Sequence, residues 1–154
     1  MIAAVHASRE DLLARSGLEF MHAVLRGEMP RPPMADTLNY RLTEVSEGAI
    51  TFIGTPTLEH TNPMAGVHGG WYGTLLDSAM GCAVMTVVPK GRLYTTLEYK
   101  INITRALRPG TEITAKARVD HSGRTTAVAQ GEIRGVEDNK LYATGTTTCL
   151  IMDG

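Results

Sequence analysis

The stretch NPMAGVHGGWYGTLLDSAMG, residues 62–81, decides how this chain folds. Its first half is a turn rich in proline and glycine, and its second half opens a run of mostly apolar residues that continues to Val88. We expect a helix over 70–88 that ends at the segment 89–91, which contains proline and glycine. A helix that is apolar on nearly every face has to be enclosed. The stretch therefore predicts a central buried helix.

Strand-like segments lie on both sides of this helix. Six are expected, rich in Thr, Val, Ile and Tyr or alternating apolar with polar residues, at 38–45, 49–57, 93–105, 111–121, 125–134 and 140–152. A long antiparallel sheet wrapped around the central helix would enclose it, and this α+β arrangement is the hotdog fold. One face of such a sheet still needs cover, so we expect the chain to self-associate.

The N-terminal part predicts a helix and a linker. Residues 9–27 form an amphipathic pattern with Ser8 as a candidate N-cap. Three prolines, at 30, 32 and 33, then predict an extended connection. We expect a single domain over 1–154, with the helix and linker at 8–34 and the core at 36–152. The first ten residues are too short and too mixed for a secretory signal.

Composition and charge narrow the class of function. The 154 residues carry a formal net charge of −1 and no basic block, which argues against nucleic acid and anionic membranes as partners. The run 71–88 contains a carboxylate and lacks flanking basic clusters, so we do not expect it to span a membrane. Cys82 and Cys149 lie in apolar runs without metal-ligand spacing, which indicates two buried thiols in a reducing cytoplasm.

Asp77 is the candidate catalytic residue. It lies in the middle of the predicted helix, and burying a lone carboxylate there costs several kcal/mol. The alternative is a helix Asp that is exposed to solvent or satisfied by a neighbouring backbone group, but its neighbours at 75, 76, 79 and 80 leave no polar face. At the helix start, backbone N–H groups meet the positive end of the helix dipole, where a developing oxyanion would be stabilised. These features together indicate acyl chemistry.

The motif Asn-x-x-x-Gly-x-His-Gly-Gly at 62–70, with Asp nine residues after the His, resembles the signature of the PaaI-type hotdog acyl-CoA thioesterases. The resemblance runs from about Gly17 to Met152. It implies that Asp77 acts as general base or nucleophile and that the N–H of Gly69 donates to the oxyanion. Gly70 would let the backbone approach the substrate closely.

The same resemblance assigns supporting roles. Asn62 would donate to the thioester carbonyl or the attacking water, although Asn-Pro is also a common turn opener. His68 would orient the turn or the thioester, although lone histidines are usually structural. Thr96 would hold the water beside the carboxylate, with Thr95 as a possible substitute, although threonine is common in strands.

Two arginines complete the resemblance. Gly123 and Arg124 match the family's Gly-Arg hairpin, and Arg105 follows the strand after the helix. The resemblance implies that they hold the CoA phosphates, which arginine recognises well, whereas the other interpretation is a solvated surface arginine. One departure is Asn139, where the family would have a glycine in the last hairpin, but asparagine tolerates the left-handed conformation.

The spacing of Gly69 and Asp77 predicts a shared site. Eight residues on a straight helix span roughly 12 Å, whereas an attacking group must lie close to a carbonyl held about 3 Å from its donors. We therefore expect Asn62 and Gly69 of one chain to face Asp77 and Thr96 of a two-fold mate.

The sequence thus predicts a thioesterase that hydrolyses acyl-CoA as a dimer or a dimer of dimers, with coenzyme A as part of the substrate and no metal or other cofactor. Two alternatives remain, a hotdog enoyl-CoA hydratase or dehydratase and a non-catalytic acyl-CoA sensor. The acyl group is open, because Trp71, Tyr72 and Met64 suit an aryl or a medium-chain pocket. No nucleophile elbow, phosphate loop or dinucleotide fingerprint is present in the sequence.

Overall fold

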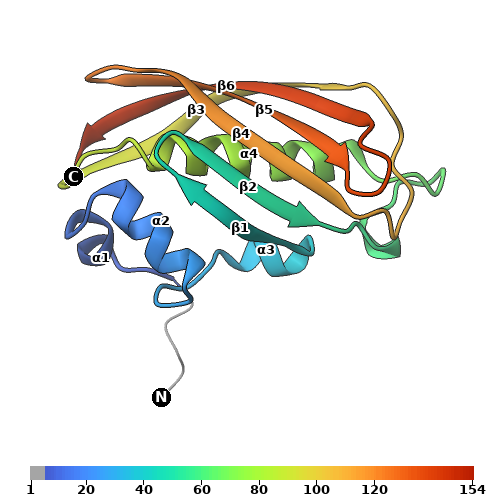
Figure 1. The fold of residues 1–154 in the computed structure, drawn as a ribbon, viewed down its shortest axis with the longest axis horizontal. Helices are drawn as coiled ribbons and strands as arrows, with labels where there is room; N and C mark the ends of the chain where they lie inside the picture. The colour runs from blue at the N-terminus through green and yellow to red at the C-terminus, as the bar shows by residue number, and fades with distance from the viewer. Residues whose placement is uncertain (1–5) are drawn as a thin grey trace.

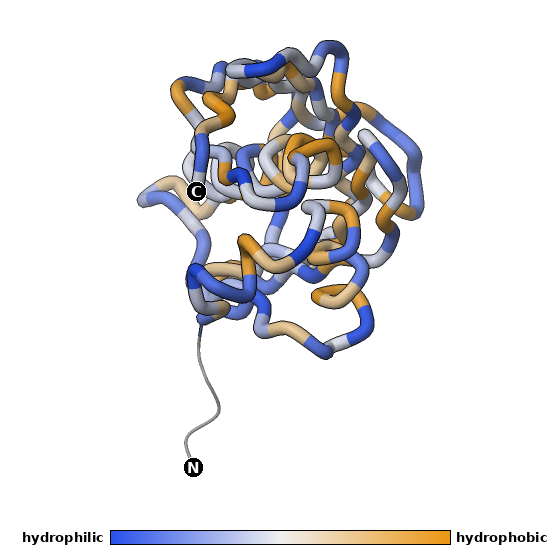
Figure 2. Tube along the Cα trace, turned by 90° about the vertical axis from the view of Figure 1, so that its left-hand side faces the viewer, coloured by the Kyte–Doolittle hydropathy of each residue, from blue (hydrophilic) through white to orange (hydrophobic). Residues whose placement is uncertain are grey.

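The computed structural model describes residues 6–154, so Met1–Val5, part of the segment tested above for a signal, lie outside the described residues. The elements are α1 (Arg9–Leu13), α2 (Gly17–Leu25), α3 (Pro33–Thr37), β1 (Tyr40–Ser46), β2 (Ala49–Gly54), the 3-10 turn η1 (Leu58–His60), α4 (Gly69–Met85), β3 (Arg92–Ile103), β4 (Ile113–Ser122), β5 (Thr126–Gly135) and β6 (Leu141–Asp153). The six strands form one antiparallel sheet in the order β1-β2-β4-β5-β6-β3. The sheet curves over α4, and the N-terminal helices lie on the other side of α4 (Figures 1 and 2). The predicted hotdog fold is confirmed.

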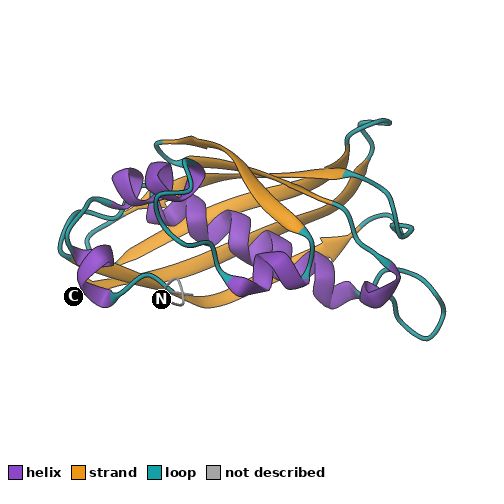
Figure 3. Cartoon of the chain, turned by 90° about the horizontal axis from the view of Figure 1, so that it is seen from below, coloured by secondary structure: helices purple, strands orange, loops and turns teal. Residues whose placement is uncertain are grey.

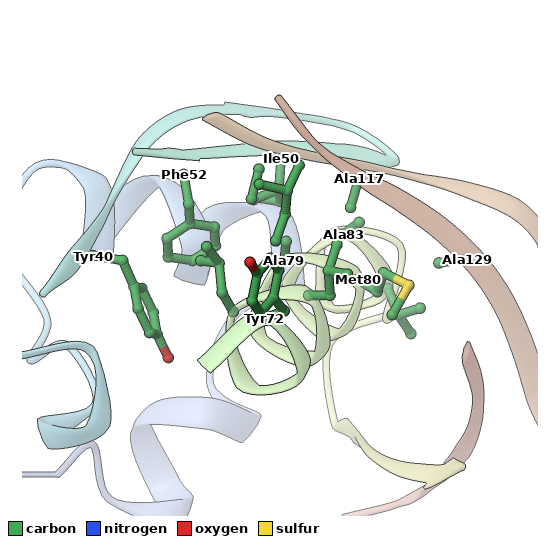
Figure 4. Close-up of a cluster of buried hydrophobic side chains, with 14 of the residues drawn as sticks. Tyr40, Ile50, Phe52, Tyr72, Ala79, Met80, Ala83, Ala117 and Ala129 are labelled. Carbon is green, nitrogen blue, oxygen red and sulfur yellow. The ribbon is translucent and has the colours of Figure 1, made fainter. Parts of the chain in front are cut away.

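The central helix is buried as its apolar pattern predicts. Leu75, Leu76, Ala79 and Met80 are fully buried in a core that also holds side chains from β2, β4 and β5. Figure 4 shows Ala79 and Met80 of this core on α4. Where the helix crosses β5 and β6, each strand has a glycine, and an added Cβ would lie within 3.3 Å of Leu76 or Met80. Because glycine has no side chain, the sheet can approach α4 closely at these two positions.

The N-terminal prediction of one helix is wrong. Two short helices, α1 and α2, replace it, and Ser16 begins the second with a capping box to Glu19. The extended linker is also wrong in part, because α3 starts at Pro33, a residue suited to the first position of a helix. Figure 3 shows these helices from below, together with α4 under the strands.

β3 is the edge strand that matters for the site. It is 12 residues long and pairs only with β6 among the described strands. A bulge at Leu97 lets Thr96 pair with Cys149 and Glu98 with Thr148. Three large apolar side chains on this edge are at least 45% exposed: Leu97, Tyr99 and Ile103. A long edge with exposed apolar side chains is a template for pairing with another chain.

Candidate active site

Asp77 and Thr96, two residues predicted from the sequence for the candidate site, are in contact. The hydroxyl of Thr96 on β3 donates a hydrogen bond of 3.0 Å to Oδ1 of Asp77 on α4. Burial raises the pKa of Asp77 above its usual value, and the hydrogen bond from Thr96 lowers it in part. Within residues 6–154 no Lys, Arg or His pairs with this carboxylate. The site therefore holds a half-buried carboxyl group without a counterion.

A stripe of glycines on α4 positions this carboxylate. Every fourth residue along this part of α4 faces β3, namely Gly69, Gly73, Asp77 and Gly81. A Cβ added at Gly73 would lie 3.4 Å from the Tyr99 ring, and one added at Gly81 would lie 2.9 Å from the Tyr94 hydroxyl. The strand can lie against the helix because three of these positions carry no side chain. Asp77 is the one stripe residue that reaches from α4 to β3.

The turn before α4 leaves one N–H group free. His68 is the N-cap, and its Nδ1 accepts a hydrogen bond of 2.9 Å from the N–H of Gly70. The N–H of Gly70 is therefore occupied, whereas that of Gly69 has no acceptor among the described residues. Gly69 is the first residue of the helix, where the dipole favours negative charge. His68 therefore caps the helix, and among the described residues nothing occupies the N–H of Gly69.

Asn62 shapes the same turn. Its Oδ1 accepts hydrogen bonds from the N–H groups of Met64 at 2.9 Å and Gly66 at 3.2 Å. This is the turn-opening role that Asn-Pro suggests. Its Nδ2 has no acceptor among the described residues, so the amide can still donate to a ligand.

Thr95 is not beside Asp77. It pairs with Leu150 and is exposed on the opposite face of the sheet, because successive strand residues point to opposite faces. The prediction that Thr95 could substitute for Thr96 next to the carboxylate is therefore wrong.

The two arginines do not meet within one chain. Arg124 follows Gly123 in the β4–β5 turn, and its carbonyl accepts a hydrogen bond from Arg92 at the start of β3. Arg105 follows the other end of β3. Twelve strand residues span about 40 Å, so a single copy does not gather both arginines around one CoA.

The aromatic residues proposed for an acyl pocket lie elsewhere. Trp71 and Tyr72 are buried to 2% and 1% exposure, and both donate hydrogen bonds to backbone carbonyls. Met64 is 88% exposed in the turn. Within one chain these three side chains therefore do not line a common pocket. Pattern analysis missed Tyr94, whose ring covers Gly81 one turn after Asp77, because a tyrosine in a strand carries no distinguishing signal.

Two kinds of feature are absent from the described residues. No group of three or more His, Cys, Asp or Glu side chains within 6–154 is arranged to hold a metal ion. In the same range no helix is long and apolar enough to cross a membrane.

The chain is similar to known proteins over most of its fold. Residues 64–142, just over half of the chain, match the Thioesterase superfamily. Acyl-coenzyme A thioesterase 13 of Mus musculus is 30% identical over 90 residues, which cover 58% of this chain and 64% of that protein. The match therefore spans less than two thirds of that relative.

Solved structures of similar proteins support the same family. A phenylacetic acid degradation-related protein from Ralstonia eutropha has 30% identity and a TM-score of 0.77, covering 85% of this chain and 98% of its own. The PaaI protein of E. coli, at 24% identity, shares the fold with a TM-score of 0.78, covering 92% of this chain and 97% of its own. The chain therefore belongs to the thioesterase superfamily. Within it, the chain has the PaaI-type hotdog fold, which confirms the resemblance predicted from the sequence, and thioesterase is the enzyme class that these relatives support.

Proposed function

We propose that the protein hydrolyses acyl-CoA thioesters to the free acid and CoA, with Asp77 as general base or nucleophile. One observation carries this proposal: the half-buried Asp77 has no counterion among residues 6–154, has a raised pKa and accepts a hydrogen bond from Thr96. A carboxylate in such surroundings is poised to take a proton or attack a carbonyl.

In the proposed reaction the thioester carbonyl accepts a hydrogen bond from the N–H of Gly69, assisted by the helix dipole and the amide of Asn62. Asp77 takes a proton from water as the water oxygen attacks the carbonyl carbon. The tetrahedral oxyanion then collapses, the C–S bond breaks, and the thiolate of CoA leaves and is protonated. In the covalent variant the carboxylate attacks directly and water hydrolyses the resulting anhydride. Neither route uses a metal or a redox cofactor, and coenzyme A enters only as part of the substrate.

The second half of the site is proposed to come from another copy. Gly69 and Asp77 lie two turns apart on α4, roughly 12 Å. α4 runs antiparallel to β3, because Gly69 lies beside Ile103 and Gly81 beside Tyr94. If the β3 edges of two copies pair antiparallel around Tyr99, Thr96 and Asp77 of one copy approach the Gly69 end of the other. This arrangement supplies the donor and the base to one carbonyl.

The same pairing bears on the CoA site. The start of β3, next to Arg124, would lie beside the end of β3 in the partner, next to its Arg105. Two arginines that are separated in one chain would then flank one CoA, where each can bind a phosphate. We propose a dimer of this kind, or a dimer of such dimers, acting in the cytosol, where Cys82 and Cys149, both free, remain thiols.

Lysines on this edge should separate the subunits. A double change, Leu97→Lys with Tyr99→Lys, places charges on the pairing edge, and natural edge strands use lysine against such pairing. We expect a monomer in analytical ultracentrifugation and at least about a hundredfold lower kcat/KM, since each site loses half of its groups. Met34→Lys with Val136→Lys, at apolar positions that are 51% and 48% exposed away from β3, is the control. A folded, fully active monomer would contradict the shared site.

Two alternatives predict other products. A hydratase or dehydratase needs an acid–base pair at the β-carbon, but Nδ1 of His68 is engaged by the N–H of Gly70. A sensor would bind acyl-CoA without turnover. The test is release of CoA thiol from aryl, short, medium and long acyl-CoAs, run beside an assay for hydration of enoyl-CoA. Thiol release supports the thioesterase. Hydration alone would support the hydratase or dehydratase instead, and binding without either product would support the sensor.

The acid limb of the pH profile tests the role of Thr96. Asp77 acts as a carboxylate, so activity is present above its pKa and lost as pH falls through it. Because burial raises this pKa, the limb should lie above the range of an ordinary aspartate. Thr96→Val removes the hydrogen bond that lowers the pKa, so the limb of kcat/KM should move to still higher pH. Thr95→Val, on the opposite face, should leave it in place, and an unmoved limb in Thr96→Val would refute the assignment.

A further inference from the structure

A large cavity lies between the N-terminal helices and the core. It has a volume of about 730 Å³ and is lined by α2, the segment before α3, β1 and one side of α4. Its inner wall includes Phe20, Tyr40 and Phe52, which are at most 9% exposed. Figure 4 shows Tyr40 on the side of α4 away from Ala117 and Ala129. The cavity is therefore distinct from the packed interface between α4 and the centre of the sheet.

One end of this cavity reaches the residue next to the proposed catalytic carboxylate, although Asp77 itself is not part of the lining. Ser78, the residue after Asp77 on α4, lines it, and so does Tyr94, which covers Gly81 one turn further along. Burial raises the pKa of Tyr40, Cys82 and Tyr94, all in the lining, and the charge of Asp77 raises each of them further. The charge of Asp77 thus acts on three side chains of the lining.

The lining suits an apolar ligand. Apart from the rim, most of its side chains are hydrocarbon, aromatic or thioether groups, and none is a carboxylate. The two hydroxyls of Tyr40 and Ser78 are 2.8 Å apart and hydrogen-bond to each other, so neither needs a partner from a ligand. At the rim Arg31 pairs with Asp36. An uncharged chain could enter without breaking the hydrogen bond between Tyr40 and Ser78.

We propose that this cavity receives the acyl chain of the thioester, and that the preferred substrates carry an apolar chain of medium or greater length rather than an aryl group. The proposal rests on the proposed hydrolysis at Asp77 and adds the substrate class. A cavity of about 150 Å³ is sufficient for a benzene ring, so this one has room for considerably more than a single ring. Each methylene buried should raise kcat/KM by about fourfold until the cavity is filled.

The test changes the size of the cavity. Val24, a half-buried residue of α2 in the lining, becomes Trp, and Val136, 48% exposed in the turn after β5, receives the same change as a control. We expect the ratio of kcat/KM for dodecanoyl-CoA to that for butyryl-CoA to fall at least tenfold in Val24→Trp and to stay at the wild-type value in Val136→Trp. Leu25→Trp, at a 37% exposed position of the lining, gives a second reading if Val24→Trp does not fold. An unchanged ratio in a folded lining variant would overturn the proposal.

A binding measurement separates this proposal from the proposed function. S-dodecyl-CoA, a thioether that cannot be hydrolysed, is titrated calorimetrically into wild type and Val24→Trp. If wild type hydrolyses no acyl-CoA but binds S-dodecyl-CoA at least tenfold more tightly than Val24→Trp does, the function fails and the cavity stands. If hydrolysis is fast but neither the chain-length ratio nor this affinity responds to Val24→Trp, the function stands and the cavity assignment fails.

Discussion

Changing Asp77 to Asn is expected to lower kcat for acyl-CoA hydrolysis by about 10³-fold, because Asn can neither take a proton from water nor attack the carbonyl. The change keeps the size of the side chain and an oxygen that can accept the hydrogen bond from Thr96. The raised pKa of Asp77 means that its ionisation costs folding stability at pH values above that pKa. The variant should therefore melt no lower than wild type at pH 8, which separates lost chemistry from lost folding.

Binding and a matched control complete this experiment. Asp77→Asn should still bind S-dodecyl-CoA within a few-fold of wild type, and retained binding with lost turnover excludes a sensor. Asp120→Asn changes an exposed carboxylate that pairs with Arg118 on the far face of the sheet. It should keep wild-type kcat. If Asp77→Asn retains more than a tenth of wild-type kcat, the carboxylate is not the catalytic group.

The second large effect is recovery of activity from two inactive chains. Gly69→Pro removes the proposed oxyanion donor, and proline suits the first position of a helix. His68 before it has φ −62° and ψ 138°, which proline tolerates in the preceding residue. We expect Gly69→Pro alone to lose about a hundredfold or more in kcat while remaining folded.

Mixing this chain with Asp77→Asn tests where the two groups meet. If the site is shared between two-fold mates, each mixed dimer has one intact site and one doubly defective site. Random reassociation should then restore about a quarter of wild-type activity. The control mixes the Asp77→Asn chain with a chain that carries both Asp77→Asn and Thr96→Val. This mixture should restore no activity, because neither chain supplies Asp77. If Gly69 and Asp77 of one chain act together, the first mixture also stays inactive.

Several parts of this protein follow from local sequence rules. The apolar run after Gly69-Gly70 predicts α4, and β-rich segments between turns predict all six strands, since burial imposes both periodicities. Asn139 adopts a positive φ of 52° in the last hairpin, as its tolerance of this conformation allows. The break at Ser16 was also readable, because Ser16 and Glu19 form the capping-box pattern that begins a helix.

Other features depend on packing and are not encoded locally. Thr95 and Thr96 are neighbours of the same residue type, and only the pairing of β3 with β6 decides which side chain faces Asp77. The separation of Arg105 from Arg124 follows from the length of β3 and the topology of the sheet. The cavity lies where three short helices pack beside α4 without filling the space between the helices and the core. This is a result of tertiary packing, which the periodicity of the sequence does not predict.

The position of Cys82 has a consequence for a protein that liberates a thiol. Its side chain borders the cavity five residues after Asp77, where burial, with the neighbouring carboxylate, raises the pKa of the thiol to about 12. At neutral pH only on the order of one such thiol in 10⁵ is a thiolate. Because the thiolate is the reactive form, Cys82 should neither intercept the acyl group nor form a mixed disulfide with oxidised coenzyme A. A cysteine can thus lie close to the proposed substrate site without reacting with the thioester.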